Sequence, residues 1–473
     1  MSLRPDIVLI APPLLWNNEL RPDMKQPLNL LYLGSWLNRA GFKAKVLDAV
    51  IEQYDLEKVL QIIEEIRPVF VGIPFYQATR GTALELCAAI RRELPEIWIV
   101  AGGPLATTSA ESLLKHSEID FCVIGEGEQT LSELLKSGLP SKRSPEYDFS
   151  HVRNIAGLAF FEVDKNIYAS EREPIADLDD LPFVDFNLIN IEKYFAYHSS
   201  IEMSDWLFLT TSRGCHARCV FCATPVLWPR GMRRQTVPRL LAEIVFQRER
   251  YPTAQFGFMD DSFFSDKAWL REFFSGIGSM NVKYCCIGRA DHLNEDDVAG
   301  LAATGCIYVA LGIETGNQLR QKQLKKYLDL ARVKQSVQML KKHDVFCKGF
   351  FMLGFPDETA EEMLETINFA VELKELGMGE CSFFPVSIYP GTELAERFSD
   401  TYQVSKIYEP DFRDKNSDDY AEARMRRYAN IPDADINSYF TASQILKIVR
   451  FAYQRVEKSE KAEISEFIAA SDS

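Results

Sequence analysis

The first 140 residues alternate short apolar runs with stretches whose apolar residues have helical spacing, and this alternation strongly constrains the fold. The apolar runs are residues 6–11, 43–48, 69–73, 97–103 and 121–125, and the helix-like stretches are residues 28–40, 56–66, 82–93 and 109–115. Continuous apolar runs are typical of buried parallel strands. Strands that alternate with helices in this way predict an α/β fold with a doubly wound, Rossmann-like parallel sheet.

Polar and glycine-rich segments follow these predicted strands, where a doubly wound sheet binds its ligand. The candidate ligand contacts are Asp48, Gln77, Thr79, Gly102, Gly103, Gly125, Glu126 and Gly127. Glycines allow a ligand to approach the backbone closely, although they are equally expected in plain turns. No Gly-x-Gly-x-x-Gly follows the first strand, so the dinucleotide-binding fingerprint is missing.

A second alternation of strand-like and helix-like stretches runs from Trp206 to Ile388. Its six predicted strands are residues 207–211, 255–259, 283–288, 306–312, 346–353 and 380–388, with helices at 237–250, 267–277, 295–303, 328–342 and 360–373. This pattern predicts a partial (β/α)6 barrel with its active site at the carboxyl ends of the strands. A helix over residues 442–457 and a disordered end at 469–473 complete the expected small helical C-terminal region.

The length of the chain supports a division into domains, because a single core stops growing at roughly 250–300 residues and the chain has 473. The expected parts are a first domain at 1–140, a linker at 141–200 with a small hairpin near 158–168, the barrel at 201–400 and a helical region at 401–473. The formal net charge of −15 argues against binding to nucleic acid or to an anionic membrane. The sequence has no run of about 18 apolar residues that predicts a membrane span.

Three of the ten cysteines, Cys215, Cys219 and Cys222, have the spacing Cys-x3-Cys-x2-Cys. Cysteine thiolates hold iron–sulfur clusters, and three of them leave one iron of a cubane open to a small molecule, as catalytic metal sites leave a position open. The alternative is a structural zinc site, which usually has four ligands. His216 is the neighbouring candidate for a fourth ligand, but it would need a local turn to join the cysteines. The other seven cysteines lie mostly in apolar runs and are expected to be reduced core residues of a cytoplasmic protein.

The segment from Thr211 to Ala223, with Gly214 before the first cysteine and Phe221 before the last, resembles the radical S-adenosylmethionine (SAM) superfamily. The resemblance implies a [4Fe-4S] cluster that binds SAM at its open iron and cleaves it to a 5′-deoxyadenosyl radical. It also implies SAM contacts at the strand ends, and the matching residues are Phe221, Asp260, Asp261, Arg289, Glu314 and Thr315. Asp260-Asp261 stands where the superfamily usually has Gly-Gly-Glu. The structural alternative for these polar residues is helix capping or solvation.

Residues 5–138 resemble the cobalamin-binding domain that precedes the barrel in many radical SAM proteins. The resemblance rests on strand order and on two loops, Ala101-Gly-Gly-Pro and Gly125-Glu-Gly-Glu-Gln-Thr, and it implies cobalamin as a second cofactor. The Asp-x-His-x-x-Gly signature of many cobalamin domains is absent, and the first histidine of the chain is His116. We therefore expect base-off, His-off cobalamin, with a polar side chain or water below the cobalt.

Together the two resemblances imply an enzyme that methylates an unactivated carbon of a small molecule or natural product, with an external reductant such as flavodoxin or ferredoxin. A cobalamin-dependent ring rearrangement, cyclisation or oxidation is the alternative with the same cofactors. A methylthiotransferase would need a second cysteine cluster, and only Cys87 and Cys122 precede Cys215. The alternative without catalysis is a binding module stabilised by zinc.

Overall fold

The computed structural model describes residues 4–13, 24–143, 149–162, 165–168, 170–200, 205–398 and 437–472. The chain divides into two compact units, Met1–Leu209 and Thr210–Ser473. No helix among the described residues combines the length and the apolar character needed to cross a membrane.

A seven-stranded sheet with the order β2-β1-β3-β4-β5-β6-β7 forms the centre of the first unit. Its first part contains β1 (Ile7–Ala11), α1 (Leu28–Arg39), β2 (Ala44–Asp48), α2 (Leu56–Ile66), β3 (Phe70–Pro74), α3 (Arg80–Glu93), β4 (Trp98–Gly102), α4 (Gly103–Leu114), β5 (Phe121–Val123) and α5 (Gly127–Lys136). The five strands are parallel, which confirms the predicted doubly wound fold. The strand order places a topological switch point between β1 and β3, where such a sheet binds its ligand.

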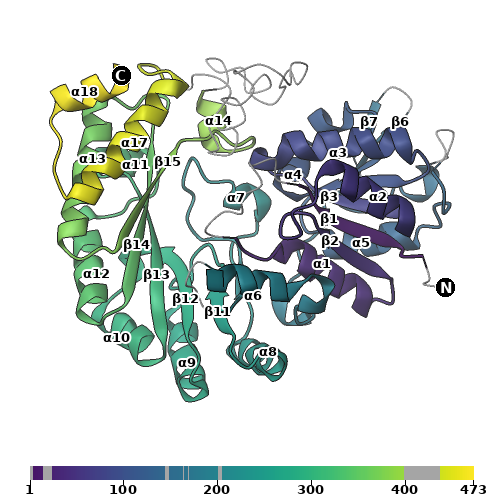
Figure 1. The fold of residues 1–473 in the computed structure, drawn as a ribbon, viewed down its shortest axis with the longest axis horizontal. Helices are drawn as coiled ribbons and strands as arrows, with labels where there is room; N and C mark the ends of the chain where they lie inside the picture. The colour runs from purple at the N-terminus through teal and green to yellow at the C-terminus, as the bar shows by residue number, and fades with distance from the viewer. Residues whose placement is uncertain are drawn as a thin grey trace. The chain divides into compact units, whose positions relative to one another are not determined.

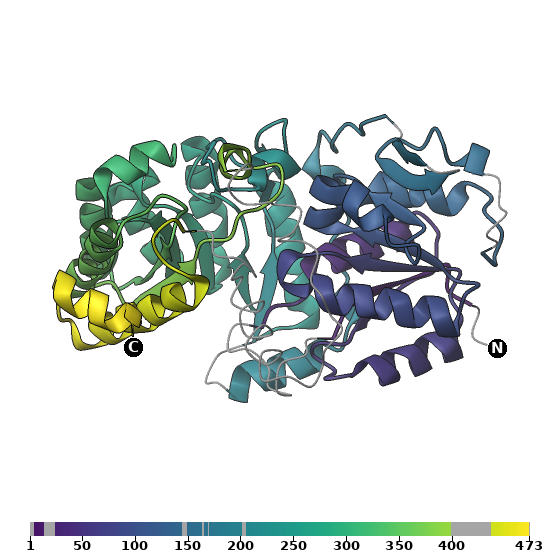
Figure 2. The ribbon, with the colours of Figure 1, turned by 90° about the horizontal axis from the view of Figure 1, so that it is seen from above.

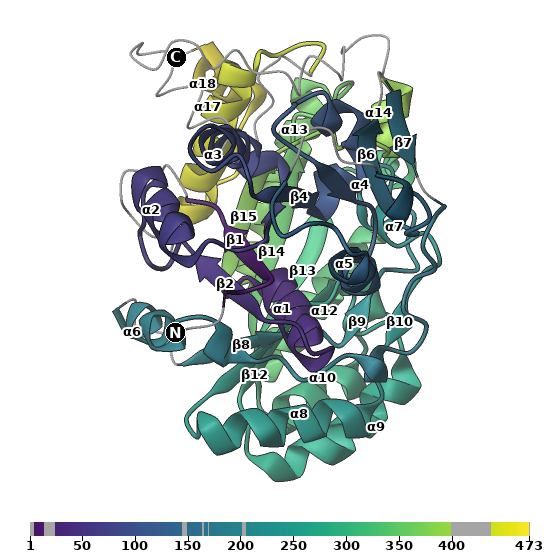
Figure 3. The same cartoon turned by 90° about the vertical axis from the view of Figure 1, so that its right-hand side faces the viewer.

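Helices cover both faces of this sheet (Figure 3). Helices α2 and α3 bury Val59 and Leu86 against one face, together with α4, and α1 and α5 bury Leu37 and Leu134 against the other. A sheet that is covered on both sides has strands that are apolar throughout. This arrangement explains why the first strands appear in the sequence as continuous apolar runs.

The hairpin predicted near residues 158–168 is present as β6 (Leu158–Glu162) and β7 (Lys165–Tyr168), and it extends the sheet. Strand β6 pairs antiparallel with β5, and the Phe160 ring packs edge-on against Phe121 with centroids 6.2 Å apart. The sequence predicts this hairpin within a linker, because the residues around it are typical of loops. Helix α6 (Ile191–Ser200) ends the connection to the second sheet.

Helix α4 begins at Gly103, six residues before the predicted start at Ser109. It consists of two helical pieces with a kink at Ser109 between them. The first piece starts at Gly103-Pro104, and proline is favourable in the first turn of a helix. The hydroxyls of Thr107 and Thr108 donate to the carbonyl oxygens of Gly103 and Pro104 at 3.1 and 3.0 Å. The predicted helix over 109–115 therefore corresponds to the second piece alone.

The second sheet has the strand order β15-β14-β13-β12-β11-β8, which confirms the six-stranded partial barrel (Figures 1 and 2). Its elements are β8 (Trp206–Leu209), α8 (Val237–Arg250), β11 (Gln255–Phe258), α9 (Lys267–Ile277), β12 (Tyr284–Arg289), α10 (Glu295–Ala303), β13 (Cys306–Glu314), α11 (Gln318–Gln323), α12 (Leu330–Lys342), β14 (Phe346–Leu353), α13 (Ala360–Glu375), β15 (Glu380–Pro385) and α14 (Glu393–Arg397). Strands β11 to β15 are parallel. Their carboxyl ends therefore meet at one edge of the sheet, where the barrel rule places the active site.

Helices α17 (Ala442–Lys458) and α18 (Ile464–Asp472) form the described C-terminal region. A capping box between Thr441 and Gln444 starts α17, and the Tyr453 ring packs edge-on against Phe383 of β15. The prediction that residues 469–473 are disordered is wrong up to Asp472, because α18 extends to that residue. The start of the predicted C-terminal region, residues 401–436, lies outside the described residues.

Six of the seven cysteines outside the motif are buried, as predicted, and Cys285 is half-buried. Cys285 and Cys286 are adjacent on β12, so their side chains point to opposite faces of the strand.

Candidate active site

The three motif cysteines lie on the loop between β9 (Ser212–Arg213) and α7 (Thr224–Leu227). Strand β9 pairs antiparallel with β10 (Arg233–Arg234), so the loop returns beside its own start. Gly214 has a φ of +89°, and a Cβ atom there would lie 2.3 Å from the carbonyl oxygen of Gly231. Only glycine fits this position, because any side chain would overlap the backbone.

Backbone hydrogen bonds anchor the middle of the loop to other parts of the barrel. The Val220 amide donates to Leu324 O at 3.0 Å, and the Leu394 amide donates to Val220 O at 2.8 Å. The Phe221 ring lies edge-on to Phe355, which follows β14, with centroids 6.0 Å apart. The loop is therefore fixed at the carboxyl end of the sheet by the segments that follow β13, β14 and β15.

The chemistry of the donors fits an iron–sulfur cluster, because three thiols lie on one anchored loop near two cations. Burial raises the pKa of the Cys219 thiol, and Lys326 and Arg289 oppose this effect. Burial also raises the pKa of Cys222 to about 11, against hydrogen bonds from Thr224. The described side chains include no converged metal-binding group of three or more histidine, cysteine, aspartate or glutamate residues, so the three thiols do not point to one centre.

Asp260 holds the start of the cysteine loop through hydrogen bonds to its backbone. Its carboxylate is buried and accepts from the backbone amides of Thr211 and Ser212 at 2.7 and 2.9 Å, and also from the Thr211 hydroxyl. Arg234 lies 3.8 Å away, and burial still raises the pKa of Asp260. Both oxygens of this predicted SAM contact are thus occupied by the protein itself.

Asp261, Arg289 and Glu314 surround the cysteine loop at the ends of β11, β12 and β13. Asp261 is exposed and accepts from the Thr224 hydroxyl at 3.1 Å. The Arg289 guanidinium donates to both carboxylate oxygens of Asp291 at 3.1 and 2.9 Å. Glu314 pairs with Lys326, which sequence reasoning missed because Lys325-Lys326 resembles an ordinary surface pair of charges.

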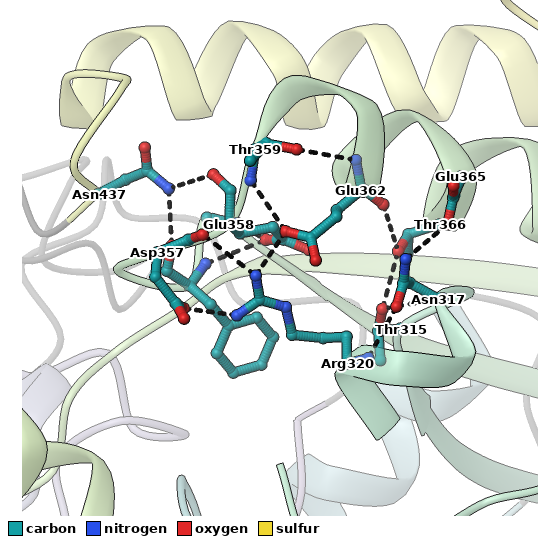
Figure 4. Close-up of polar contacts among 12 residues, drawn as sticks. Thr315, Asn317, Arg320, Asp357, Glu358, Thr359, Glu362, Glu365, Thr366 and Asn437 are labelled. Carbon is teal, nitrogen blue, oxygen red and sulfur yellow. Dashed lines mark hydrogen bonds and ion pairs between the residues drawn. The ribbon is translucent and has the colours of Figure 1, made fainter. Parts of the chain in front are cut away.

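Thr315, the residue after β13, belongs to a polar network with Asn317 and Thr366 (Figure 4). Its side chain is fully buried, contacts the Thr366 hydroxyl at 3.1 Å and accepts from the Asn317 amide at 3.1 Å. Asn317 is the N-cap of α11, and Thr315 supports this cap by accepting from the Asn317 amide. The network continues to Arg320, which bonds to Asp357 and Glu362 at 2.5 Å each.

Glu358 is the buried acid of this network, on the turn that follows β14 (Figure 4). Its Oε2 accepts from the amides of Gly354 and Phe355 at 2.7 and 3.0 Å. The Asn437 amide group donates to the carbonyl oxygens of Phe355 and Glu358 at 2.6 and 2.9 Å. Burial raises the pKa of Glu358 to about 7, although Arg320 and the two amides lower it.

We expect a Glu358→Gln substitution to remove a pH-dependent part of the stability. The Glu358 carboxyl is protonated in both states below the unfolded pKa of about 4.3, so its contribution is complete there and is lost as the pH rises. The loss continues through the folded pKa of about 7 and amounts to about 4 kcal/mol at most. Urea unfolding between about pH 5 and pH 8 should show a shallower decline in the variant. Glu361→Gln, on the exposed first turn of α13, is the control, and parallel curves for all three proteins would contradict the expectation.

In the first unit, four predicted ligand contacts lie at the carboxyl edge of the sheet. Two of them have side-chain oxygens without a hydrogen-bond partner in the described structure, and two are glycines with open space beside them. Gln77 Oε1 and Thr79 Oγ1, in the short helix after β3, are buried and have no hydrogen-bond partner within the described structure. Cβ atoms at Gly102 and Gly125 would meet nothing within 4 Å. Unpartnered polar atoms and open glycines at the carboxyl edge of the sheet fit a ligand that contacts both side chains and backbone.

The other four predicted contacts have structural partners. Asp48 is buried and accepts from the Tyr194 hydroxyl at 2.7 Å, and burial raises its pKa. Glu126 accepts from the Ile175 amide at 2.8 Å. A Cβ at Gly103 would lie 3.3 Å from the Phe75 carbonyl oxygen, and one at Gly127 would lie 3.1 Å from the Leu33 side chain, so both glycines serve packing.

Relatives of this chain include methyltransferases and a cyclase. An uncharacterised methyltransferase of Pyrococcus horikoshii is 27% identical, over 90% of this chain and 86% of its own length. The cytidylyl-2-hydroxyethylphosphonate methyltransferase of Streptomyces wedmorensis is 26% identical, over 79% of this chain and 78% of its own. The anaerobic magnesium-protoporphyrin IX monomethyl ester cyclase of a Synechocystis species is 25% identical, over 72% and 67%.

The fold also resembles that of a solved structure. The radical SAM methyltransferase TsrM from Kitasatospora setae, with tryptophan substrate and a SAM analogue bound, superimposes with a TM-score of 0.66 at 18% identity. The match covers 83% of this chain and 76% of TsrM. At this identity the match supports the fold.

Two family models match the chain, the B12 binding domain over residues 23–135 and the Radical SAM superfamily over residues 209–370. A doubly wound sheet followed by a partial barrel with a three-cysteine loop defines the class as a radical SAM enzyme with a B12-binding domain. The chain therefore combines a B12 binding domain with a domain of the radical SAM superfamily, and a relative that matches 90% of the chain is named as a methyltransferase. Its domains imply SAM, a [4Fe-4S] cluster and cobalamin as cofactors.

Proposed function

We propose that this enzyme methylates an unactivated carbon of a small-molecule substrate by a radical mechanism. The observation that carries the proposal is the anchored loop with Cys215, Cys219 and Cys222 at the carboxyl end of the barrel strands, in a chain that also has a B12-binding domain. Two of the relatives named above are methyltransferases, which supports methyl transfer. When bound, the cluster supplies the electron that splits SAM into methionine and a 5′-deoxyadenosyl radical, and cobalamin supplies the methyl group.

We assign the cluster to the three motif thiols, which would converge by side-chain rotation on the fixed loop. Phe221, Asp261, Arg289 and Glu314 are the proposed SAM contacts, because they surround that loop. An acidic side chain such as Asp261 accepts well from an ammonium group. Asp260 and Thr315 would support the site from behind, since their oxygens already have protein partners.

We place cobalamin at the carboxyl edge of the first sheet, near Gln77, Thr79, Gly102 and Gly125. The proposed state is base-off and His-off, because no histidine precedes His116 in the chain. Gly102 has a φ of −136°, which any residue adopts, so a larger side chain there fills space without backbone strain.

A Gly102→Leu substitution should weaken the binding of hydroxocobalamin roughly ten-fold or more, because about 1.4 kcal/mol of lost contact is enough for that change. Its thermal unfolding should stay close to that of the unchanged protein. Spectroscopic titration with hydroxocobalamin measures the effect, and Asp48→Asn is the matched control at a partnered position. Equal affinity in Gly102→Leu and the unchanged protein would place the corrin elsewhere.

Cyclisation or another rearrangement without methyl transfer is the second candidate, favoured by the relative that is a monomethyl ester cyclase. SAM with an isotope-labelled methyl group separates the two reactions. Methyl transfer puts the label into the product, which gains one methylene in mass, whereas the alternative leaves the product unlabelled.

The proposed setting is the cytoplasm, with flavodoxin or ferredoxin as the electron donor and no nucleic acid as a partner. All ten cysteines carry free thiols, as expected in a reducing compartment. The net charge of −15 opposes binding to polyanions.

Anaerobic reconstitution with iron, sulfide and hydroxocobalamin tests the proposed function. We expect about four iron atoms per chain, broad visible absorption, and release of 5′-deoxyadenosine from SAM under a strong reductant. A colourless protein with stoichiometric zinc, or an iron-loaded protein that never cleaves SAM, would overturn the proposal.

A further inference from the structure

A buried ion pair lies beside the cysteine loop, on a segment bonded to that loop. The Lys326 ammonium lies 2.8 Å from Glu314 Oε1, and the lysine side chain is 7% exposed. Two residues before Lys326, the Leu324 carbonyl oxygen accepts from the Val220 amide of the cysteine loop. The backbone that carries this cation is therefore attached to the proposed cluster ligands.

Three residues around the ion pair have a left-handed backbone. The φ angles are +70° at Glu314, +52° at Lys325 and +58° at Tyr327. Side chains of these types rarely adopt such angles, and this kind of strain gathers at functional sites. The pairing of β13 with β14 is also irregular between Gly312 and Glu314. Left-handed residues therefore lie at Glu314 and on both sides of Lys326.

Gln321 holds both halves of this arrangement in place. Its fully buried side-chain amide donates to Ile313 O and to Thr315 O at 2.8 Å each, on either side of Glu314. Its backbone carbonyl oxygen accepts from the backbone amides of Lys326 and Tyr327 at 3.1 and 3.0 Å. A single residue thus fixes the backbone on both sides of the ion pair.

Gly312 leaves the space that the pair occupies. A Cβ atom at this position would lie 2.7 Å from Glu314 Oε1 and 3.0 Å from the Lys326 ammonium. The ion pair therefore packs directly over the β13 backbone at the carboxyl end of the sheet.

We propose that Lys326 is a positioning residue that keeps a fixed positive charge beside the cysteine loop and thereby makes the cluster easier to reduce. The inference rests on the proposed cluster at Cys215, Cys219 and Cys222. Reduction adds one negative charge to a centre already held by thiolates, and a nearby fixed cation stabilises that charge. Removal of the lysine would also leave the Glu314 carboxylate unpaired near the cluster, which would oppose reduction further.

The test is a redox titration of the reconstituted cluster without SAM, followed by electron paramagnetic resonance. We expect Lys326→Met to lower the ratio of reduced to oxidised cluster at a fixed potential about ten-fold, which is a shift of 59 mV to more negative values for one electron. Lys325→Met is the matched control, because this neighbouring lysine pairs with Glu393 and is 41% exposed. The control should titrate like the unchanged protein, and Lys326→Arg should stay close to it.

A double variant keeps the test decisive if Lys326→Met does not hold the cluster. Lys326→Met with Glu314→Gln removes both charges at once, so it leaves no unpaired carboxylate and should titrate closer to the unchanged protein than Lys326→Met does. Equal potentials for the Lys326 and Lys325 variants would overturn the inference, and so would weaker SAM binding at an unchanged potential, which would make Lys326 a SAM contact. An unchanged protein that binds no iron would instead overturn the proposed function.

Discussion

A Cys219→Ala variant should release no measurable 5′-deoxyadenosine from SAM under a strong reductant, yet it should bind hydroxocobalamin as the unchanged protein does. Cys219 is 9% exposed, and the adjacent Val220 is anchored on both sides, so no other thiol can take its place on the loop. Loss of one thiolate leaves two ligands for a cluster that needs three from the protein. The B12 binding domain match ends at residue 135, so corrinoid binding should be independent of this change. Chromatography of the reaction products and a corrinoid titration measure the two properties.

Cys347→Ala is the matched control for this experiment. Cys347 lies on β14 in the same barrel, is 2% exposed, and stands outside the motif. The control should keep SAM cleavage. Persistent cleavage in Cys219→Ala, or equal loss in both variants, would show that the assignment of the cluster thiols is wrong.

A Gly214→Ala substitution should lower the iron bound per chain roughly ten-fold or more. A left-handed alanine costs about 1–2 kcal/mol by itself, and its Cβ would also overlap the Gly231 carbonyl oxygen at 2.3 Å. The backbone would have to move next to Cys215, so the three thiols would no longer have the relative positions that a cluster requires. Iron analysis after reconstitution, together with far-ultraviolet circular dichroism to confirm folding, measures the effect.

Gly231→Ala separates the overlap from the backbone strain. Gly231 has a φ of +83°, but its Cβ position has nothing within 4 Å. This variant carries a similar φ penalty without the overlap, so it should retain most of its iron. If both variants lose iron equally, backbone strain alone explains the effect, and close packing of the loop is not required.

The sequence predicted the regular elements best where local signals were strong. Helices α8, α9 and α10 begin and end where expected, because Thr236, Asp266 and Asn294 cap their first turns. Helix α12 starts two residues later than expected, since Asp329 is its N-cap. The early start of α4 was missed although Pro104 is a local start signal, and α18 was missed because it depends on packing of Phe467 against Phe440 and Phe451.

The candidate site was predictable only in its local part. The cysteine loop is a short motif, so its chemistry is visible in the sequence itself. The partners of Asp48 and Thr315 come from Tyr194 and Thr366, far along the chain, and no spacing rule reveals such contacts. Lys326 and Gln321 were missed for the same reason, because their burial results from the fold.

The contact between the C-terminal helices and the turn after β14 limits how this enzyme can exchange parts with its relatives. A Cβ at Gly354 would lie 2.9 Å from Ile445 of α17, and Asn437 is bonded to the carbonyl oxygens of the same turn. A chimaera that joins this barrel to a foreign tail should therefore replace the chain from before Asn437 onward. It should also replace the turn after β14 with the corresponding turn of the donor protein. Substrate preference, if it resides in the tail, can be transplanted only together with that turn.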